Sequence, residues 1–339
     1  MTILDMNLGE SSYPIYIGKN LLKDANKYFN LNRKALIVTD DGVPHKYAQD
    51  VANLCASAIV VTVKSGEESK SLASLEKLLR TMLENDFERS DCIVAVGGGV
   101  VGDLAGFASS VYMRGIDFYN VPTTLLSQVD SSIGGKTAVN FGGVKNNIGS
   151  FKQPRAVLVD IDTLSTLPPR HLSSGLAESI KMSLTSDKEL FDFFKTHSKE
   201  EIYNNIEEII VKSLAIKKRV VEEDEKENGI RKILNFGHTL GHGIESAEGM
   251  SGLYHGECVA LGMLPVSAQQ IKNDLIEIFK KVDLPYAYKG DLSKAISYIS
   301  HDKKCSAGML SIIRVETPGE YIIEKISLDS FYNLVINEY

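Results

Sequence analysis

The residues best suited to chemistry in this chain are three histidines within one short stretch. In ILNFGHTLGHGIES, His238 and His242 stand four positions apart and therefore share one face of a helix. His255 follows in LYHGECVALG, 17 positions after His238. A lone helical histidine is more often structural than a ligand, but three among glycines favour a metal site. The spacing does not decide which of them bind.

A carboxylate would complete such a site, because zinc and similar borderline metals bind imidazole together with Asp or Glu. A catalytic site of this kind keeps an open position for water or substrate. The candidate carboxylates are Glu257, Glu245 and, further off in SGLAESIKM, Glu178.

Basic residues gather where glycines and small residues leave space. Any one of them alone is best explained as a surface side chain. As a set they suit a small substrate that bears both phosphate and carboxylate, which guanidinium forks and ammonium groups bind well. The set comprises Arg114, Lys136, Lys145 beside Asn146, Lys181, Lys217, Arg231, and the pair Lys303 and Lys304.

A glycine-rich turn suggests where a nucleotide could bind. Gly97, Gly99 and Gly102 form a GxGxxG match directly after an expected strand and at the start of an expected helix. Backbone N–H groups in such a turn can approach a pyrophosphate. A plain tight turn explains the match equally well, and no clear ribose-binding acid stands at the usual offset.

Two further loops strengthen the nucleotide interpretation. The loop SGEESKS places Glu67 and Lys70 after a strand, at the edge where open α/β sheets bind ligands. The segment VPTTLLSQVDSSIGGKTAVN holds Thr123, Thr124 and Asp130 among small residues that allow close backbone approach. Three such loops from one sheet favour a nucleotide.

The elements that must position these residues follow from hydrophobic periodicity. In the first half, short β-branched runs alternate with amphipathic segments such as 71–83, which predicts a Rossmann-like parallel sheet covered by helices. The expected strands are 13–17, 35–39, 58–63, 92–96, 118–121 and 156–160. Later segments carry helical periodicity instead, at 174–184, 202–223 and 255–271. Pro168-Pro169 marks the junction, so we expect an α/β domain over 1–167 and a mostly helical domain over 168–339.

Composition excludes several classes of protein. The 339 residues carry 37 Lys and Arg against 44 Asp and Glu, which offers no general attraction to nucleic acid or an anionic membrane. No apolar stretch approaches the roughly 20 residues of a membrane span, and the first residues do not resemble a signal peptide. The 4 scattered cysteines indicate a reduced, cytoplasmic compartment.

Ten motifs, taken together and in order, resemble the 3-dehydroquinate synthase family. They are PIYIG, GEESKS, GGGVVGDLAGFASS, YMRG, VPTTLLSQVDSSIGGKTAVN, KNNIGSFKQP, TLPPRHLSSGLAESIK, LNFGHTLGHGIE, HGECVALGM and HDKK. The resemblance covers nearly the whole chain. It implies an N-terminal nucleotide-binding α/β domain, a helical C-terminal domain, and a homodimer with the active site in the cleft between the domains.

The resemblance also implies site residues, motif by motif. The metal ligands become Glu178, His238 and His255, with zinc or cobalt as the ion. NAD contacts become Asp40, Glu67, Lys70, Gly98, Gly99, Asp103, Thr123, Thr124, Lys136, Lys145, Thr163 and Thr166. The substrate pocket becomes Asp130, Lys136, Asn146, Lys181, Lys217, Glu227, Arg231, Asn235 and His242, with Arg114 reaching across the dimer. The resemblance does not decide between Lys303 and Lys304 for a last basic contact.

The implied reaction converts a phosphorylated sugar acid, 3-deoxy-D-arabino-heptulosonate 7-phosphate, to 3-dehydroquinate and phosphate, with NAD reduced and then reoxidised. Two alternatives share the fold. Another sugar phosphate cyclase would act on substrates without a carboxylate, which leaves Arg231 and Lys217 unexplained. A polyol dehydrogenase of the glycerol dehydrogenase kind would not need so many Lys and Arg residues. A non-catalytic nucleotide-binding protein predicts loss of the metal-site residues, which are all present.

Overall fold

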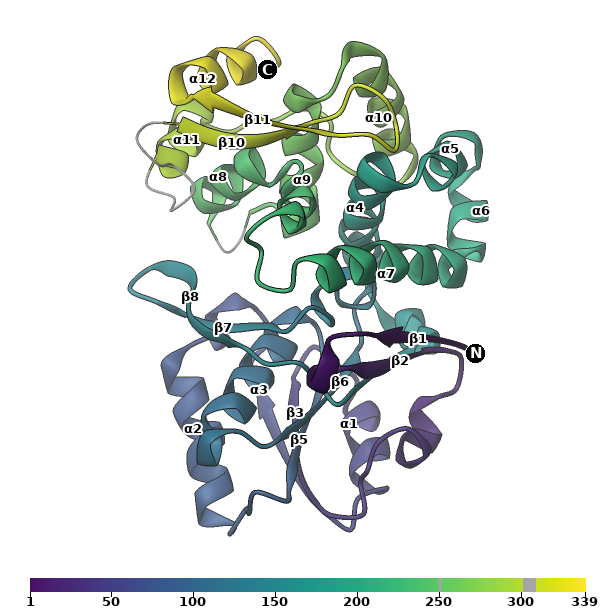
Figure 1. Ribbon diagram of the computed structural model, residues 1–339, viewed down its shortest axis with the longest axis vertical. Coiled ribbons are helices and arrows are strands. Elements are labelled where there is room, and N and C mark those ends of the chain that lie inside the picture. Colours follow the sequence, from purple (N-terminus) through teal and green to yellow (C-terminus); the bar gives the residue numbers. More distant parts are fainter. Residues whose placement is uncertain (250–251, 301–308) are drawn as a thin grey trace. The chain divides into compact units, whose positions relative to one another are not determined.

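The chain consists of two compact units, Met1–Leu167 and Pro168–Tyr339 (Figure 1). The structure, a computed structural model, describes residues 1–249, 252–300 and 309–339. Helix α4 (Pro169–Ser186) opens the second unit with a proline in its first turn. Proline suits that position because the first N–H groups of a helix have no hydrogen-bond partner within the helix, so the missing N–H of proline costs no hydrogen bond. Lys303 and Lys304 lie outside the described residues.

The first unit is built on a seven-stranded sheet in the order β1-β2-β9-β6-β5-β3-β4. Every neighbouring pair is parallel except β1 and β2, which are antiparallel. All six expected strands are present. The strands are β1 (Thr2–Met6), β2 (Tyr13–Gly18), β3 (Lys34–Asp40), β4 (Ser57–Val63), β5 (Cys92–Gly97), β6 (Asp117–Pro122) and β9 (Ala156–Asp160).

Apolar cores lie on both faces of this sheet, because successive side chains of a strand point to opposite faces. Leu36, Val38 and Ile93 pack on the side covered by α2 (Leu72–Glu84) and α3 (Gly99–Val111). Ile37 and Val94 pack on the side covered by η2 (Leu22–Lys27) and α1 (His45–Ala52), and Figure 1 shows these helices against the strands. The Rossmann-like α/β fold is confirmed.

The strand order determines where ligands can bind. Moving along the chain, β4 is added on one side of β3 and β5 on the other, so the order reverses between β3 and β5. The loops that follow β3, β4, β5, β6 and β9 all leave the same edge of the sheet, because these strands are parallel. Open α/β sheets bind ligands at that edge, beside the point of reversal.

Strand β1 was not among the expected strands. Two further features of the first unit were also not expected from the sequence. One is the π-helical turn η5 (Ser127–Ser131), which contains Asp130. The other is a hairpin of β7 (Lys136–Phe141) and β8 (Val144–Phe151). Its turn is Gly142-Gly143, both with positive φ, as a two-residue hairpin turn requires. Strand β8 is largely exposed, so it lacks the apolar run by which the other strands were recognised.

The second unit is mainly helical, as expected. Its helices are α4, α5 (Lys188–Thr196), α6 (Lys199–Asn204), α7 (Ile206–Glu223), α8 (His238–Glu248), α9 (His255–Met263), α10 (Gln269–Lys281), α11 (Leu292–Ser300) and α12 (Leu328–Ile336), with the short turns η7 (Ile230–Asn235) and η8 (Leu264–Val266). None of the helices within the described ranges is long and apolar enough to cross a membrane.

The second unit differs from expectation in three places. The helix expected over 202–223 is broken at Asn205, where α6 ends and α7 begins. The helix expected over 255–271 ends at Met263, and Pro265 lies in the turn that follows. A hairpin of β10 (Met309–Arg314) and β11 (Ile322–Ser327) was not expected, because β11 has no fully buried residue and its pattern is mixed.

Candidate active site

A carboxylate and two imidazoles converge in the second unit. Glu178 lies on α4, His238 is the first residue of α8, and His255 is the first residue of α9. The Oε1 atom of Glu178 lies 3.5 Å from His238 Nε2 and 3.4 Å from His255 Nε2. One ligand atom from each of the three residues lies within 4.8 Å of the others. The structure therefore brings together the three ligands that the resemblance implied.

The surroundings of Glu178 keep its carboxylate ionised. Its side chain is fully buried, and neither carboxylate oxygen has a well-oriented hydrogen bond, although Lys181 Nζ lies 2.5 Å from Oε2. Burial raises the pKa of Glu178, but Lys181 and His255 lower it more strongly, to about 2. The carboxylate is thus ionised and faces two imidazole nitrogens. One oxygen and two nitrogen donors fit zinc or cobalt, with positions left for substrate.

Close helix packing holds these three side chains in place. A Cβ atom on Gly256 would lie 1.9 Å from the backbone oxygen of Ser174 on α4. A Cβ atom on Gly262 would lie 1.9 Å from the backbone oxygen of Gly237, beside α8. Helix α9 can approach both neighbours only because glycine stands at these positions. The glycines around the histidines therefore have a packing role.

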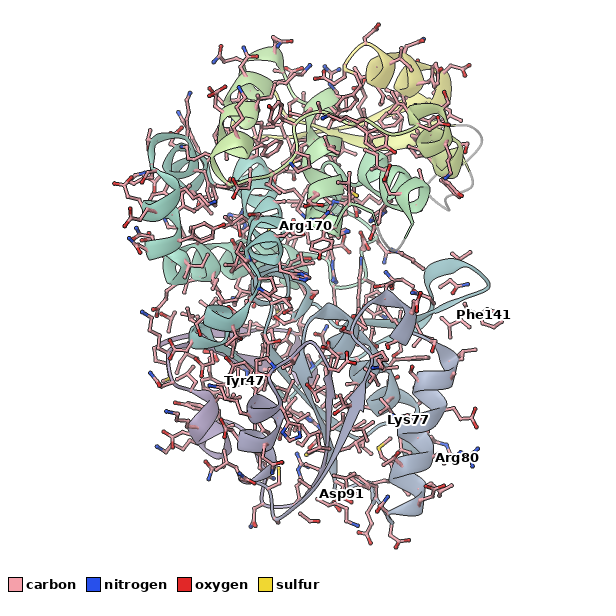
Figure 2. The ribbon with its side chains drawn as sticks, turned by 180° about the vertical axis from the view of Figure 1, so that it is seen from behind. Tyr47, Lys77, Arg80, Asp91, Phe141 and Arg170 are labelled. Carbon is pink, nitrogen blue, oxygen red and sulfur yellow. The ribbon has the colours of Figure 1, made fainter. Side chains whose placement is uncertain are left out.

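The structure distinguishes Glu257 from Glu178 as a candidate ligand. Glu257 forms a bidentate ion pair with Arg170, whose Nε and Nη2 each lie 2.7 Å from a carboxylate oxygen. It also accepts a hydrogen bond from Tyr254 N, which caps α9. The guanidinium group of Arg170, labelled in Figure 2, lies 4.0 Å from the centre of the Tyr254 ring. Glu257 thus fastens the start of α9 to α4, whereas Glu178 faces the histidines.

The second unit also buries basic side chains, and one of them, Lys181, contacts Glu178. Lys181, Lys217 and Arg231 are all buried. Lys181 donates to the backbone oxygen of Leu234 in η7 at 2.6 Å, and η7 also carries Arg231. Buried cations are costly in free energy unless anionic groups or hydrogen-bond acceptors compensate them. Lys181 is compensated by Glu178, and Arg231 donates from its guanidinium to the backbone oxygen of Glu225.

Three more predicted substrate residues lie in this unit. Asn235 Nδ2 donates to Glu227 Oε1 at 2.7 Å, which pairs two residues from either side of Arg231. The ring of His242 lies 5.2 Å from that of His238 and 6.0 Å from that of His255. His242 is half-buried beside the Glu178 cluster without belonging to it.

In the first unit, the glycine-rich turn forms a cradle at the ligand-binding edge. Gly97 ends β5 and Gly99 begins α3. A Cβ atom on Gly98 would lie 3.0 Å from Thr124 Cγ2, and one on Gly99 would lie 3.0 Å from Ser131 Oγ. Thr123 N donates to the oxygen of Gly97 at 3.0 Å, which ties the turn to the loop after β6. In this cradle the backbone atoms of the turn are therefore not covered by side chains of their own.

A polar network joins this edge to the β7–β8 hairpin. The buried Lys70 forms an ion pair with Asp103 on α3 and a hydrogen bond to Asn146 on β8. Asn140, which the sequence analysis did not single out, donates to Glu67 Oε1 at 2.8 Å and accepts from Asn146 N at 2.9 Å. The only sequence signal for Asn140 is its place at the end of the GGKTAVN motif.

The remaining predicted residues are placed as follows. Asp40 ends β3 and accepts from Gly42 N at 2.8 Å. Thr163 and Thr166 lie in η6 (Ile161–Thr166). Thr163 Oγ1 accepts a hydrogen bond from Gln128 Nε2 at 3.0 Å. Thr166 Oγ1 lies 3.2 Å from the Oη atom of Tyr47, which is labelled in Figure 2. Five of the predicted site residues are exposed at the surface: Arg114, Lys136, Lys145, Asn146 and Thr166.

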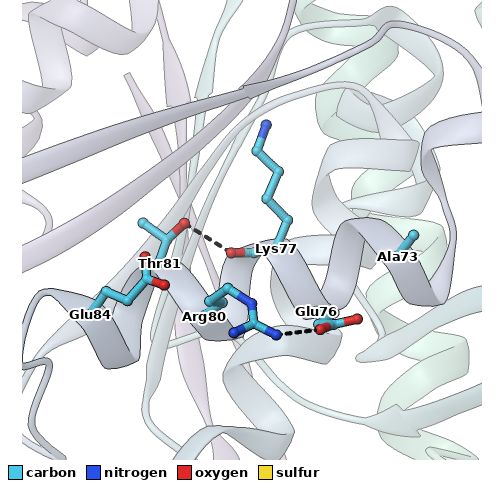
Figure 3. Close-up of a pocket in the computed structure, with 6 residues that line it drawn as sticks. All are labelled: Ala73, Glu76, Lys77, Arg80, Thr81 and Glu84. Carbon is cyan, nitrogen blue, oxygen red and sulfur yellow. Dashed lines mark hydrogen bonds and ion pairs between the residues drawn. The ribbon is translucent and has the colours of Figure 1, made fainter.

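A hollow of about 340 Å³ lies along the exposed face of α2 (Figure 3). Its lining comes from successive turns of this one helix. Arg80 pairs with Glu76 at 2.7 Å, and Thr81 donates to the oxygen of Lys77 at 2.8 Å. These are ordinary contacts on a solvated helix face, so the hollow does not indicate a binding site.

A parallel sheet with a glycine cradle, combined with a helical unit that holds a carboxylate and two histidines, is typical of enzymes that use a nucleotide together with a divalent metal. Comparison with known families makes this specific. The family model described as 3-dehydroquinate synthase N-terminal matches residues 60–174, and the one described as 3-dehydroquinate synthase C-terminal matches residues 175–305. The chain belongs to the 3-dehydroquinate synthase family.

Individual relatives agree with this assignment. A curated 3-dehydroquinate synthase from Clostridium beijerinckii is 41% identical over 350 residues, which cover 98% of this chain and 100% of that protein. A crystal structure of 2-deoxy-scyllo-inosose synthase complexed with carbaglucose-6-phosphate, NAD+ and Co2+ matches with a TM-score of 0.88 and 26% identity over the whole of both chains. A probable glycerol dehydrogenase from Sinorhizobium meliloti matches with a TM-score of 0.64 and 16% identity over 95% of both chains, which shows a shared fold alone.

Proposed function

We propose that this chain is a 3-dehydroquinate synthase, a lyase that converts 3-deoxy-D-arabino-heptulosonate 7-phosphate to 3-dehydroquinate and phosphate with catalytic NAD and a divalent metal. The observation that carries the proposal is the buried Glu178 carboxylate, which faces His238, His255 and Lys181. A metal-type donor set in contact with the buried Lys181, in a unit that also buries Lys217 and Arg231, suits a substrate that is both a polyol and an anion.

The residues present fit both cofactors. Glu178 Oε1 and the two Nε2 atoms would hold zinc or cobalt, and the absence of well-oriented hydrogen bonds to Glu178 supports this. Gly98 and Gly99 would admit the pyrophosphate of NAD, because side chains there would fill the cradle. When bound, the metal supplies Lewis acidity toward substrate hydroxyl groups, and NAD supplies a hydride acceptor.

The other proposed NAD contacts follow the ligand-binding edge of the sheet. Asp40 lies at the end of β3, the strand next to the point where the order reverses. Acidic and hydroxyl side chains there can accept or donate hydrogen bonds to ribose hydroxyl groups. We assign the contacts to Asp40, Glu67, Lys70, Gly98, Gly99, Asp103, Thr123, Thr124, Lys136, Lys145, Thr163 and Thr166.

The chain's own groups would bind and orient the substrate. Lys217 and Arg231 would bind its anionic groups, since a buried guanidinium can donate two parallel hydrogen bonds to a carboxylate. Asn235 would donate a hydrogen bond to Glu227 and so fix the position of this carboxylate. His242 would face the substrate beside the metal ligands. Such fixed groups hold the reacting atoms close for ring closure. The remaining contacts are Asp130, Lys136, Asn146 and Lys181, with Arg114 from a second subunit.

We also propose that 1–167 is the NAD-binding domain and that 168–339 binds metal and substrate. The glycine cradle lies in the first unit, and the Glu178 cluster lies in the second. A homodimer is proposed from the family resemblance and from the exposed position of Arg114.

A cytoplasmic location is proposed from the cysteines. Cys55, Cys92 and Cys258 are free thiols. Burial raises the pKa of Cys55 to about 11 and that of Cys92 to about 12, so both stay protonated and unreactive at neutral pH. Unreactive free thiols suit a reducing compartment.

The decisive experiment follows NAD during turnover. In a synthase, NAD accepts a hydride and returns it to the same molecule, so NAD is required but not consumed. With the heptulosonate phosphate as substrate, phosphate should appear continuously while the absorbance of free NADH stays flat. Stoichiometric build-up of NADH with glycerol, together with no phosphate release from the heptulosonate phosphate, would refute the proposal and favour a polyol dehydrogenase.

A second substrate distinguishes the synthase from related cyclases. A hexose 6-phosphate carries the phosphate but has no carboxylate for Arg231 and Lys217. We expect no phosphate release from it under conditions in which the heptulosonate phosphate is turned over. Release of phosphate from the hexose 6-phosphate, but not from the heptulosonate phosphate, would identify a cyclase of the inosose-forming kind.

A further inference from the structure

The imidazole ring of His255 lies between two carboxylates. Its Nε2 atom is 3.4 Å from Glu178 Oε1, and its Nδ1 atom is 3.4 Å from Glu245 Oε2. A ring nitrogen that donates a proton cannot also bind a metal, so an acceptor beside one nitrogen decides which nitrogen is available. Glu245 therefore faces the nitrogen that is not directed at the metal position.

The other histidine ligand is arranged in the same way. His238 Nδ1 lies 3.1 Å from the backbone oxygen of Phe236, while its Nε2 faces Glu178. Both histidines thus present Nε2 to one point and direct Nδ1 at an oxygen acceptor. The acceptor for His238 is the backbone and cannot be removed by substitution. The acceptor for His255 is a side chain.

The position of Glu245 is fixed by α8. His238, His242 and Glu245 occupy positions i, i+4 and i+7 of this helix, so they share one face. The helix is held from another side by α11, where a Cβ atom on Gly243 would lie 2.5 Å from the oxygen of Ala295. The same rigid helix thus supplies one metal ligand and the carboxylate that faces the other.

We infer that Glu245 is a positioning residue, which accepts the Nδ1–H of His255 and so fixes the ring with Nε2 toward the metal. This inference rests on the proposed metal site at Glu178, His238 and His255. One rival exists, because ligand atoms of His242, Glu245 and His255 also lie within 4.8 Å of one another. A second ion there would need His255 to lose both ring protons, whereas a hydrogen bond to Glu245 needs only an ordinary neutral imidazole.

The test uses the full chain stripped of metal. Zinc affinity is measured by competition with a chromophoric chelator, and cobalt is added as a spectroscopic probe of ligand geometry. Loss of a carboxylate that orients a metal-binding histidine typically weakens metal binding about 10- to 100-fold. Glu245→Ala should therefore lose affinity in that range and shift the visible spectrum of bound cobalt. Glu245→Gln keeps an acceptor oxygen, so its affinity should stay within a few-fold of that of the unaltered protein.

A matched control is Glu248→Ala, which removes a carboxylate from the same helix where it pairs with Tyr288 at 2.8 Å. Its zinc affinity and cobalt spectrum should match those of the unaltered protein. The inference is overturned if Glu245→Ala keeps both properties. It is also overturned if the unaltered protein binds two equivalents of metal and Glu245→Ala binds one, because Glu245 would then be a ligand.

His238→Ala separates this inference from the proposed function. If His238→Ala loses metal while Glu245→Ala keeps normal affinity and spectrum, only the role of Glu245 fails. If His238→Ala itself binds zinc with unchanged affinity, the metal site is misassigned and both proposals fail together.

Discussion

Three of the predicted site residues have backbone conformations that side chains rarely adopt. Arg114, Asn146 and Glu227 have φ angles of 68°, 55° and 61°. Such conformations cost of the order of 1–3 kcal/mol in free energy and cluster at functional sites, where the surrounding structure holds them. This observation comes from the backbone and does not depend on the motifs that first singled out these residues.

At the residue scale, the ion pair of Glu178 with Lys181 gives a prediction about stability. Both side chains are buried, so Glu178→Ala would leave the ammonium of Lys181 without its carboxylate. Breaking a buried pair from one side costs about 3–5 kcal/mol. We expect the metal-free variant to lose free energy of unfolding in that range, measured by urea denaturation.

The double variant Glu178→Ala with Lys181→Met provides the control. With both charges gone, most of the lost stability should return, although zinc binding should not. A Glu178→Ala variant as stable as the unaltered protein would show that Lys181 is compensated by other groups.

The sequence alone did not decide which residues would bind the metal. The spacing of His238 and His242 predicted a shared helix face, which α8 confirms. Spacing did not distinguish Glu178 from Glu245 or Glu257, because the choice depends on how α4, α8 and α9 pack. The pairing of Glu257 with Arg170 and the hydrogen bond that Asn140 donates to Glu67 are tertiary contacts between distant segments, and nothing local in the sequence specifies them.

At the scale of elements, the contact between α4 and α9 gives a second prediction. Gly256→Ala would place a Cβ atom 1.9 Å from the oxygen of Ser174, so the start of α9 must move. His255 precedes this glycine and would move with it. We expect zinc affinity to fall by at least about tenfold, and stability to fall by about 1–3 kcal/mol, as is usual for overpacking.

Gly229→Ala tests whether the effect is local. A Cβ atom at this position would lie 3.6 Å from Asp224 Oδ2, which is ordinary contact. Zinc affinity should not change in this variant. If Gly256→Ala also binds zinc normally, the contact with Ser174 does not determine the position of His255.

A third prediction concerns the hairpin and the loop after β4. Asn140→Asp keeps the size and the acceptor oxygen of the side chain but replaces the amide that donates to Glu67 with a carboxylate. Repulsion between the two carboxylates should displace Glu67. We expect NAD affinity to fall about 10- to 100-fold, since a hydrogen bond to a charged group contributes about 1.5–3 kcal/mol. Calorimetric titration with NAD measures this, and unchanged affinity would show that Asn140 does not position Glu67.

Elements with continuous apolar runs were predictable, and the others were not. Strands β3 and β5 are almost wholly buried, so their sequences are nearly uninterrupted hydrophobic stretches. Strands β8 and β11 are half or more exposed, and their mixed sequences do not differ from those of loops. The breaks at Asn205 and Pro265 were missed because helical periodicity continues on both sides of each.

At the scale of the whole molecule, the exposed Arg114 gives a prediction about assembly. If Arg114 serves the active site of a second subunit, Arg114→Ala should raise the KM for the phosphorylated substrate about 10- to 100-fold through loss of a charge-assisted contact. Lys181→Ala should inactivate the site of its own chain. Subunits mixed from the two variants should then recover about a quarter of the sites, because half of the dimers are mixed and each has one intact site.

Subunit exchange must be shown independently, for example with a mass-labelled chain. No recovery of activity despite exchange would mean that Arg114 acts within its own chain. Recovery in mixtures that do not exchange would point to an incomplete defect in one of the variants.

The contact between Lys181 and Glu178 also has a consequence for how the protein matures in the cell. Because an ammonium group already neutralises the buried carboxylate, the second unit can fold without an ion to compensate that charge. If Glu178, His238 and His255 hold the metal, we expect its uptake to follow folding and to be reversible, unlike that of small zinc domains, which are unfolded without metal. A newly made chain could therefore wait in a folded, inactive form, and cellular metal supply would set how much of it is active.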